Sequence, residues 1–334
     1  MKIIVTGGAG FIGLNLLKYW LEQTRHKFLV IDKFSYASNR IALEHLLANF
    51  PEVLEVQEAD ISDELLMDKI FDNFMPDSLI HLAAESHVDN SITSSFPFVK
   101  SNILGTYSLL ETTRKFLFER QRKDPNFFLF HHVSTDEVYG DLEGKKGPAK
   151  ETFKYVPSSP YSATKACSDH LVTAWGRTFG INYVISNCSN NYGPLQHKEK
   201  LIPKVITNAL SGSPIPIYGD GQQIRDWLFV QDHVEALHQI FFSGVKNQTF
   251  NIGGNAEVTN ILLVELICEI LQKIKPAKYH YRKLITMVDD RLGHDRRYSI
   301  DYYKLKKQLG WSPKINLNDG LTLTIIEYLR GLET

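Results

Sequence analysis

Residues 2–23, KIIVTGGAGFIGLNLLKYWLEQ, decide the fold. The run Lys2–Thr6 is apolar and rich in β-branched residues, which predicts a buried strand. Glycines follow at positions 7, 10 and 13, and the residues from Phe11 onward predict a helix. A strand, a glycine turn and a helix in this order are the context of a dinucleotide-binding fingerprint. There the glycines let the backbone approach a pyrophosphate, and the start of the helix offers free N–H groups.

The next apolar run, Phe28–Ile31, ends at Asp32. This is close to the offset of roughly 20 residues that separates the glycines of the fingerprint from an acidic residue. A carboxylate at this position binds the adenosine ribose and repels a 2′-phosphate. The sequence therefore predicts NAD as the cofactor in preference to NADP. The neighbouring Lys33 is a feature that favours the phosphate instead.

Strands and helices keep alternating beyond this unit. The hydrophobic pattern predicts helices at 41–48, 63–74, 96–120 and 161–180, with Ser62 as a helix N-cap, and strands at 54–58, 79–83, 127–133 and 181–186. This order predicts an α/β protein with a doubly wound (Rossmann) parallel sheet and a smaller mixed C-terminal substrate lobe. We expect residues 1–187, joined again by 226–252, to form the NAD-binding domain, and residues 188–225 and 253–334 to form the lobe.

Composition excludes several classes of partner. The 37 basic and 38 acidic residues give a net charge of −1, so no basic field is available for nucleic acid or an anionic membrane. The three cysteines show no metal-ligand spacing, and we expect a reducing, cytoplasmic location. The chain begins in a strand and has no long apolar run, so we expect no signal peptide and no membrane span. His131 and His132 should point to opposite faces of a strand, and we expect no catalytic metal.

Residues 127–140, FFLFHHVSTDEVYG, turn from apolar to polar within one segment. Ser134, Thr135, Asp136 and Glu137 follow directly after the predicted strand. Ligands of open α/β sheets bind beyond the carboxyl ends of the strands, so these groups are placed for chemistry. A solvated acidic turn would give the same pattern.

Residues 161–165, YSATK, place Tyr161 and Lys165 four residues apart on one face of a predicted helix. An ammonium beside a phenol favours the phenolate, so we expect Lys165 to lower the pKa of Tyr161. Such a tyrosine can take a hydroxyl proton while a hydride leaves the same carbon. An ordinary Tyr/Lys pair on a helix has the same spacing, but the dinucleotide fingerprint upstream favours the catalytic interpretation.

Several motifs together resemble those of the extended short-chain dehydrogenase/reductases, and within that superfamily the dTDP-glucose 4,6-dehydratase family. The resemblance covers nearly the whole chain and is specific at Asp136 and Glu137, which sister nucleotide-sugar epimerases lack. The motifs are GGAGFIG, HLAAESHVD, STDEVYG, YSATK, SNNYGP, EKLIP, PIYGDGQQIRDWLFVQDH, NIGG and DRLGHDRRYSID.

The resemblance implies NAD-dependent dehydration of dTDP-glucose. Tyr161, assisted by Lys165, would remove the proton of the sugar 4-hydroxyl while hydride passes from C4 to NAD. Glu137 would then remove the C5 proton, and protonated Asp136 would donate to the departing 6-hydroxyl. Hydride returns to C6, giving a 4-keto-6-deoxy sugar nucleotide. Thr135 and Ser134 would hydrogen-bond the sugar near O4.

The resemblance also implies two sets of binding residues. The cofactor set is Gly7, Gly10, Phe11, Ile12, Gly13, Asp32, Lys33, Asp60, Ile61, Leu82, Ala83, Ala84, Ser86, Ser134, Tyr161 and Lys165. The substrate set is Ser86, His87, Thr135, Asn190, Lys200, Pro216, Tyr218, Arg225, Asn260, Arg291 and His294. With Arg225, the basic cluster Arg291, His294, Arg296 and Arg297 is expected to clamp a diphosphate.

The sequence departs from the commoner family pattern at Asn90, at Leu195, His197 and Lys198, and at Gln231. These changes leave open whether the nucleotide is dTDP or UDP. A nucleotide-sugar 4-epimerase or decarboxylase is the alternative enzyme, and a non-catalytic regulator that binds NAD or a nucleotide sugar is the alternative of another class. By resemblance we expect a homodimer that pairs through the helices at 96–120 and 161–180.

Overall fold

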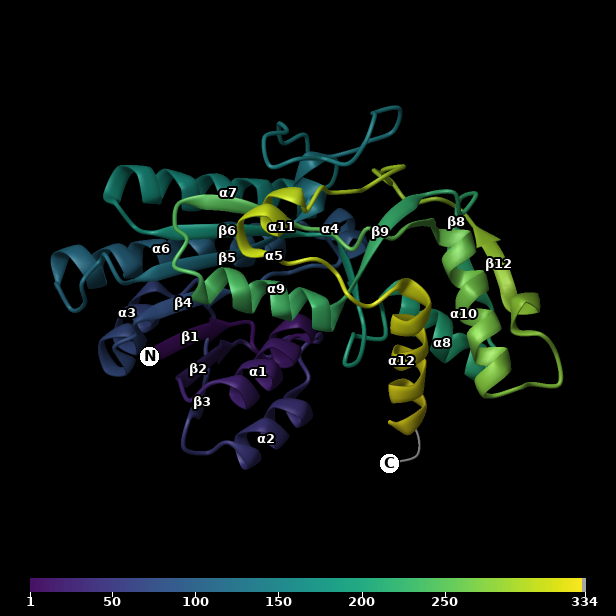
Figure 1. The fold of residues 1–334 in the computed structure, drawn as a ribbon, viewed down its shortest axis with the longest axis horizontal. Helices are drawn as coiled ribbons and strands as arrows, with labels where there is room; N and C mark the ends of the chain where they lie inside the picture. Colours follow the sequence, from purple (N-terminus) through teal and green to yellow (C-terminus); the bar gives the residue numbers. More distant parts are fainter. Residues whose placement is uncertain (332–334) are drawn as a thin grey trace.

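The computed structural model describes residues 1–331. Its centre is a seven-stranded sheet in the order β10-β6-β5-β4-β1-β2-β3, in which every neighbouring pair is parallel (Figure 1). The order reverses between β1 and β4, which is the switch point where ligands of doubly wound sheets bind. The strands of this sheet are β1 (Lys2–Thr6), β2 (Lys27–Asp32), β3 (Leu54–Glu58), β4 (Ser78–His81), β5 (Leu129–Thr135), β6 (Tyr183–Cys188) and β10 (Gln248–Ile252).

Helices cover both faces of the sheet, because alternate residues of each strand need a separate core. Ile3 and Val5 of β1 pack in one core with α1 and α9, whereas Ile4 packs in the other with α3, α6 and α7 (Figure 1). The helices of this part of the chain are α1 (Phe11–Gln23), α2 (Arg40–Asn49), α3 (Glu64–Phe74), α4 (Val88–Thr93), α5 (Phe96–Phe98), α6 (Gly105–Arg114), α7 (Pro160–Phe179) and α9 (Val230–Phe242).

A smaller mixed lobe lies beside the carboxyl ends of β5 and β6 and has a core of its own (Figure 1). It holds a three-stranded sheet, β11-β9-β7, with one antiparallel pair, and a two-stranded parallel sheet, β12-β8. Its elements are β7 (Asn190–Tyr192), α8 (Leu201–Ser211), β8 (Ile215–Tyr218), β9 (Ile224–Phe229), β11 (Glu257–Thr259), α10 (Asn260–Ile274), β12 (Ile285–Val288) and α12 (Leu317–Arg330), while α11 (Tyr303–Leu309) packs against β10. The predicted fold class, a Rossmann sheet with a mixed C-terminal lobe, is confirmed. The expected chain boundary after residue 225 falls inside β9, which pairs wholly within the lobe.

Two local predictions differ from the structure. Helix α3 is capped by Asp63, whose Oδ1 accepts from Leu66 N at 3.0 Å, and Ser62 instead hydrogen-bonds Asp60. The helix predicted over 96–120 contains two stretches of wider π-helical hydrogen bonding, Val99–Leu104 and Lys115–Glu119. Hydrophobic periodicity does not distinguish such stretches from an ordinary helix.

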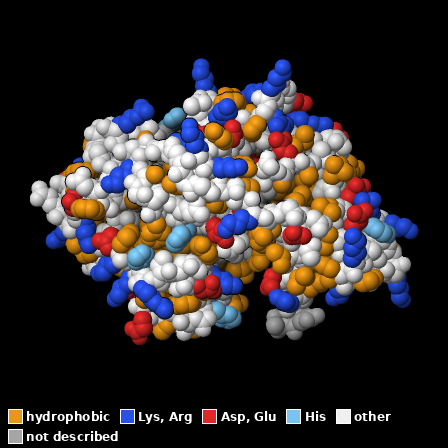
Figure 2. All heavy atoms as spheres, viewed as in Figure 1, with side chains coloured by type: hydrophobic (Ala, Val, Ile, Leu, Met, Phe, Trp, Pro, Cys, Tyr) orange, Lys and Arg blue, Asp and Glu red, His pale blue; other side chains and the backbone are white. Residues whose placement is uncertain are grey.

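The long helix α7 shows strong local signals at both ends. Ser159 and Ser162 form a capping box, Pro160 occupies the first helical position, and Gly180 ends the helix in the left-handed region at φ 76°. These signals fix the start of α7 directly before Tyr161. No helix within residues 1–331 is long and apolar enough to cross a membrane. Figure 2 shows acidic and basic side chains interspersed over the face in view.

Candidate active site

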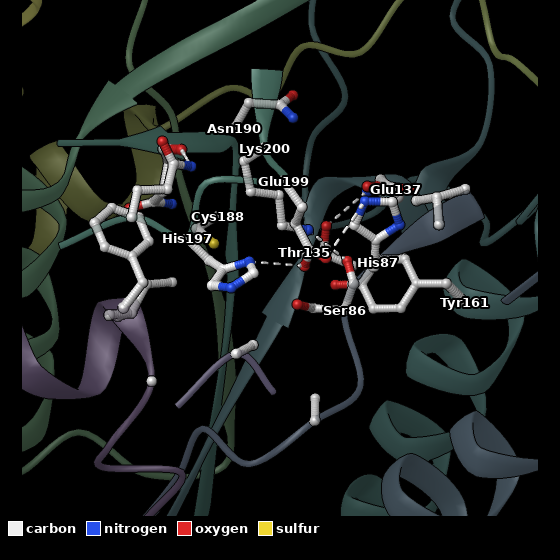
Figure 3. Close-up of a pocket in the computed structure, with 18 of the residues that line it drawn as sticks. Ser86, His87, Thr135, Glu137, Tyr161, Cys188, Asn190, His197, Glu199 and Lys200 are labelled. Carbon is white, nitrogen blue, oxygen red and sulfur yellow. Dashed lines mark hydrogen bonds and ion pairs between the residues drawn. The ribbon is translucent and has the colours of Figure 1, made fainter. Parts of the chain in front are cut away.

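One cavity of about 540 Å³ lies where the strands of the large sheet end and the smaller lobe begins (Figure 3). It is lined by residues that follow β1, β2, β4, β5 and β6, and by residues of the lobe. The cavity therefore spans the switch point of the sheet, and its size is within the usual range of ligand sites.

The glycine turn after β1 leaves no room for side chains. Gly7 has φ +71°, and a Cβ there would lie 2.6 Å from the backbone nitrogen of Ala83. A Cβ on Gly13 would lie 2.4 Å from the carbonyl oxygen of Gly7. The turn is thus packed directly against the end of β4 and against the start of α1. Its bare backbone at a helix N-terminus fits a pyrophosphate.

Asp32 closes the other side of this turn. Its Oδ2 accepts from Ala9 N at 3.0 Å, and its Oδ1 accepts from Phe34 N at 2.8 Å and from Ser38 Oγ at 3.0 Å. Lys33 Nζ lies 2.6 Å from Glu85 Oε1. A fixed carboxylate beside a lysine that already has a carboxylate partner fits the ribose of NAD better than a 2′-phosphate.

The carboxylate of Asp60, a predicted cofactor contact, is engaged beside the cavity in the turn after β3. Its Oδ1 accepts from Ser62 N and Oγ, and its Oδ2 lies 2.9 Å from Lys100 Nζ. It does not line the cavity within residues 1–331, whereas Ala59 and Ile61 on either side do. Its carboxylate is used to shape the turn after β3.

Asp136 and Glu137 form the first turn after β5, a 3₁₀ turn over Asp136–Tyr139 that Thr135 caps. The Thr135 hydroxyl donates to Asp136 Oδ1 at 3.3 Å and accepts from Glu137 N at 3.3 Å. Burial, followed by the charges of Glu137 and Asp226, raises the pKa of Asp136 well above its usual range. Burial also raises the pKa of Glu137, but Arg291, Arg225 and Lys200 oppose this. The environment therefore keeps Asp136 as the acid and favours Glu137 as the base.

Tyr161 and Lys165 also line the cavity, and Figure 3 shows Tyr161 beside Thr135 and Glu137. The expected lowering of the pKa of Tyr161 is wrong for the ligand-free protein. Burial and the charge of Glu137 raise that pKa well above its usual value, while the Thr135 hydroxyl lowers it. Lys165 Nζ donates to Val133 O at 2.9 Å. Lys165 and Tyr161 share a helix face, but within the described residues the lysine makes no direct hydrogen bond to the phenol.

The smaller lobe supplies cations to the cavity. The buried Arg225 donates to two carbonyl oxygens, Ile224 O at 2.8 Å and Asp295 O at 2.9 Å, and lies 4.4 Å from the ring of Tyr298. Arg291 and His294 line the same cavity.

Two other members of the expected basic cluster point elsewhere, which corrects the prediction of a single clamp. Arg296 pairs with the exposed Asp220 at 2.9 Å, and Arg297 pairs with Glu257 at 2.7 Å. They lie in an irregular segment, so their spacing along the chain gave no indication of which way each would face.

Several polar atoms around the cavity are buried and have no hydrogen-bond partner within residues 1–331. They include Asp136 Oδ2, Asn190 Oδ1, Asn260 Oδ1 and Arg291 Nε. Buried polar groups are nearly always satisfied in the functional state of a protein. This set of free donors and acceptors therefore fits a polar ligand beside the catalytic carboxylates.

Apart from Asp60, Arg296 and Arg297, the structure brings the residues predicted for the site to this one cavity. The lining residues that were missed include Asp89, Glu199 and Trp227. The first two stand inside the quoted motifs HLAAESHVD and EKLIP, so their positions were available as a signal. Trp227 carries no comparable signal, because a tryptophan in a strand is more often a core residue.

His131 and His132 lie on opposite faces of β5, as strand alternation predicts. His131 Nε2 is 2.9 Å from Ser186 Oγ and its ring stacks on Phe241, whereas His132 faces α7. Within the described part of the chain, no group of three or more His, Cys, Asp or Glu residues could hold a metal ion.

Comparison with known proteins agrees with this geometry. A family model described as GDP-mannose 4,6 dehydratase matches residues 4–324. A relative from Haemophilus influenzae named dTDP-glucose 4,6-dehydratase is 49% identical over 333 residues, which cover 98% of each chain. The chain belongs to the dTDP-glucose 4,6-dehydratase family. The resemblance inferred from the motifs is therefore confirmed.

Solved structures of both dehydratases and epimerases resemble this chain. A dTDP-glucose 4,6-dehydratase from Bacillus anthracis, in complex with NAD, matches with a TM-score of 0.87 and 36% identity, covering 100% of this chain and 98% of that one. A UDP-glucose 4-epimerase from Thermotoga maritima, with UDP-glucose, also has a TM-score of 0.87, at 30% identity, covering 99% and 100%. The fold alone thus does not separate dTDP-glucose 4,6-dehydratases from epimerases, and residues of the site have to do so.

Proposed function

We propose that this protein is an NAD-dependent dTDP-glucose 4,6-dehydratase, a hydro-lyase that forms dTDP-4-keto-6-deoxyglucose. The observation that carries the proposal is the placement of Asp136 and Glu137 in the same cavity as Tyr161 and Lys165. Oxidation at C4 requires only the tyrosine and lysine. Loss of water across C5 and C6 also requires one proton acceptor and one proton donor, which is what the two carboxyl groups supply.

NAD, when bound, supplies a reversible hydride acceptor and a cationic ring. We propose that the glycine turn at 7–13 and Asp32 hold it, within the domain of the large sheet, to which the chain returns at α9 and β10. The narrow turn and the partnered Lys33 support this assignment. The smaller lobe then holds the nucleotide and diphosphate through Asn190, Asn260, Arg225 and Arg291.

The side chains divide the proton transfers among them. Tyr161 takes the proton of the 4-hydroxyl as a phenolate, which the cationic ring of bound NAD and the Lys165 ammonium beneath the cavity would stabilise against the burial that raises its pKa. Glu137, near three cationic side chains, removes the C5 proton. Asp136, whose pKa is raised by burial, arrives protonated and donates to the departing 6-hydroxyl. The proton that Glu137 has taken is available for return to C5.

The mass of the product tests the proposal directly. We expect incubation with dTDP-glucose to give a product that has lost one water, with UDP-glucose converted poorly or not at all. An unchanged mass with inverted C4 stereochemistry would indicate an epimerase and contradict the proposal. Absence of turnover on a panel of nucleotide sugars, with NAD still bound, would favour a non-catalytic regulator.

We also propose that the protein forms a homodimer in the cytoplasm. The outer sides of α6 and α7 carry a continuous aromatic group, in which Tyr107 lies 5.8 Å from Trp175, and Trp175 lies 5.7 Å from Phe179. Tyr107 and Phe179 are each 39% exposed, and Leu104 beside them is 47% exposed. Such a patch supports pairing through these helices. Light scattering should give twice the chain mass, and Tyr107→Glu with Phe179→Glu should give monomers.

A further inference from the structure

A buried polar network lies beneath the floor of the cavity, behind the Tyr161–Lys165 pair. Its centre is Asp169, which follows Lys165 by one helical turn of α7 and is 2% exposed. The resemblance and the proposed mechanism assign this carboxyl group no role. A buried carboxylate is costly unless its surroundings compensate its charge, so its partners show what it serves.

The partners of Asp169 connect it to the catalytic lysine. His132 Nε2 lies between the two groups, 3.2 Å from Asp169 Oδ1 and 3.4 Å from Lys165 Nζ. Asp169 Oδ1 has no hydrogen-bond partner within residues 1–331, so its charge acts on the lysine across this short gap. The other carboxylate oxygen, Oδ2, accepts from Ser134 Oγ at 3.0 Å and from Tyr155 OH at 2.9 Å. The hydroxyl proton of Ser134 therefore points to Asp169 and away from the cavity.

We propose that Asp169 is a positioning residue that serves as the buried counter-ion of Lys165, one helical turn along α7 and on the other side of the His132 ring nitrogen. This inference deepens the proposed function and rests on it for its catalytic meaning. The arrangement explains how an ammonium group that is only 4% exposed keeps its charge. Apart from His132, Lys165 Nζ has one direct hydrogen-bond acceptor within residues 1–331, the neutral carbonyl of Val133.

The charges support this reading. Burial lowers the pKa of Lys165 to about 8, and Asp169 is the first opposing influence. Burial raises the pKa of Asp169 to about 6, against Lys165, Ser134 and Tyr155. Near pH 7 both groups are therefore ionised. The titratable groups around this pair are Tyr161 on the same helix, His132 on β5, His81 on β4, Cys188 on β6, Asp136 and Glu137 in the turn after β5, and Tyr155 and His170 beside Asp169.

The direction of the effect follows from these charges. Loss of the carboxylate removes the influence that raises the pKa of Lys165, so the lysine loses its proton at lower pH. An opposite charge at such distances typically shifts a pKa by about 1–3 units. Asp169→Asn should therefore lower the pKa of Lys165 by at least about one unit, a tenfold change in its proton affinity.

The direct test uses the protein without cofactor or substrate. ¹³C-labelled lysine side chains are titrated by NMR, and Lys165→Met identifies the Lys165 signal. We expect the signal to titrate near pH 8 in the unaltered protein, at least about one unit lower in Asp169→Asn, and again near the original value in Asp169→Glu. The matched control is Asp232→Asn. Asp232 lies on α9, is 1% exposed, and accepts from Lys314 N and Ile315 N away from the cavity. That variant should lose stability and leave the Lys165 titration unchanged.

An unchanged Lys165 titration in a folded Asp169→Asn protein would overturn the proposal. If that variant does not fold, Tyr155→Phe offers a second test, because it removes one hydrogen-bond donor to Asp169 and should raise the pKa of that carboxyl group. Ionisation of Asp169 produces a small step in the Lys165 NMR signal, and this step should move to higher pH. If the step does not move, the proposal is also overturned. In turnover, the loss of C4 oxidation at high pH should begin at lower pH in Asp169→Asn, with KM for the sugar nucleotide unchanged. Failure of the unaltered protein to dehydrate dTDP-glucose would contradict the proposed function but would leave the NMR result readable.

Discussion

Asp89 Oδ1 lies 2.9 Å from Arg291 NH1, and this ion pair joins α4 beside the large sheet to the segment after β12 in the smaller lobe. The other oxygen of Asp89 accepts from Tyr218 OH at 3.3 Å. The two lobe residues are predicted substrate contacts, and Arg291 Nε has no hydrogen-bond partner within residues 1–331. Asp89 thus holds the guanidinium across the cavity while leaving a donor for the ligand.

The Asp89–Arg291 pair predicts coupled effects on nucleotide binding. Arg291→Ala should weaken binding of dTDP at least about tenfold, because a hydrogen bond to a charged group is worth roughly 1.5–3 kcal/mol. Asp89→Ala should weaken binding less, and its effect should largely vanish in the Arg291→Ala background. Isothermal titration calorimetry of the four proteins measures the coupling. Additive losses would show that Asp89 does not act through Arg291.

The carboxyl pair predicts a separation of oxidation from elimination. Asp136→Asn combined with Glu137→Gln should slow loss of water by at least ~10²-fold, the usual contribution of acid–base catalysis. Oxidation at C4 should persist, so reduced cofactor should accumulate and be visible by its absorbance. Elimination at the normal rate would contradict the assigned roles.

Tyr161 predicts the complementary failure. Tyr161→Phe keeps the ring but removes the proton acceptor, so reduced cofactor should not form at all. NAD binding should be little affected, because the glycine turn and Asp32 are unchanged. Rapid-mixing absorbance measures the first step and fluorescence measures cofactor binding. Normal formation of reduced cofactor in this variant would mean that another group takes the 4-hydroxyl proton.

The raised pKa of Asp136 predicts a cost in stability that depends on pH. The folded protein holds this proton above the pH at which the unfolded chain releases it. Stability is therefore lost as pH rises from the unfolded value of about 4 toward the folded value. Asp136→Asn removes this loss, so its Tm should exceed that of the unaltered protein at pH 8, by about 1–2 °C for each 1 kcal/mol recovered in a chain of this length, and the difference should shrink toward pH 4. Equal Tm values at pH 8, measured by calorimetry, would count against the raised pKa.

Local motifs made much of the site predictable. The glycine turn, Asp32, Asp136 and Glu137 each stand directly after a strand, and the parallel sheet brings all strand ends to one edge. The fold class followed from the same alternation.

What the sequence did not reveal depends on contacts between distant segments. The separation of Arg291 from Arg296 is set by which acidic partner each finds, Asp89 or Asp220. The direction of the Tyr161 pKa shift is set by burial and by Glu137 and not by the neighbouring turn of its own helix. Nothing in the sequence indicated that Asp169 has a special role, because its partners His132 and Ser134 come near it only in the folded protein.

The path of the chain between the two sheets has a consequence for how this enzyme class can change. The chain enters the smaller lobe between β6 and β7, returns from β9 into α9, which packs on α1, and leaves again after β10. The lobe is therefore made of separate stretches, and no single cut releases it as a unit. Exchange of one contiguous segment between relatives therefore transfers only part of the lobe and of its ligand contacts. The other contacts have to change by replacement of residues in place, while the hydride chemistry beneath stays intact.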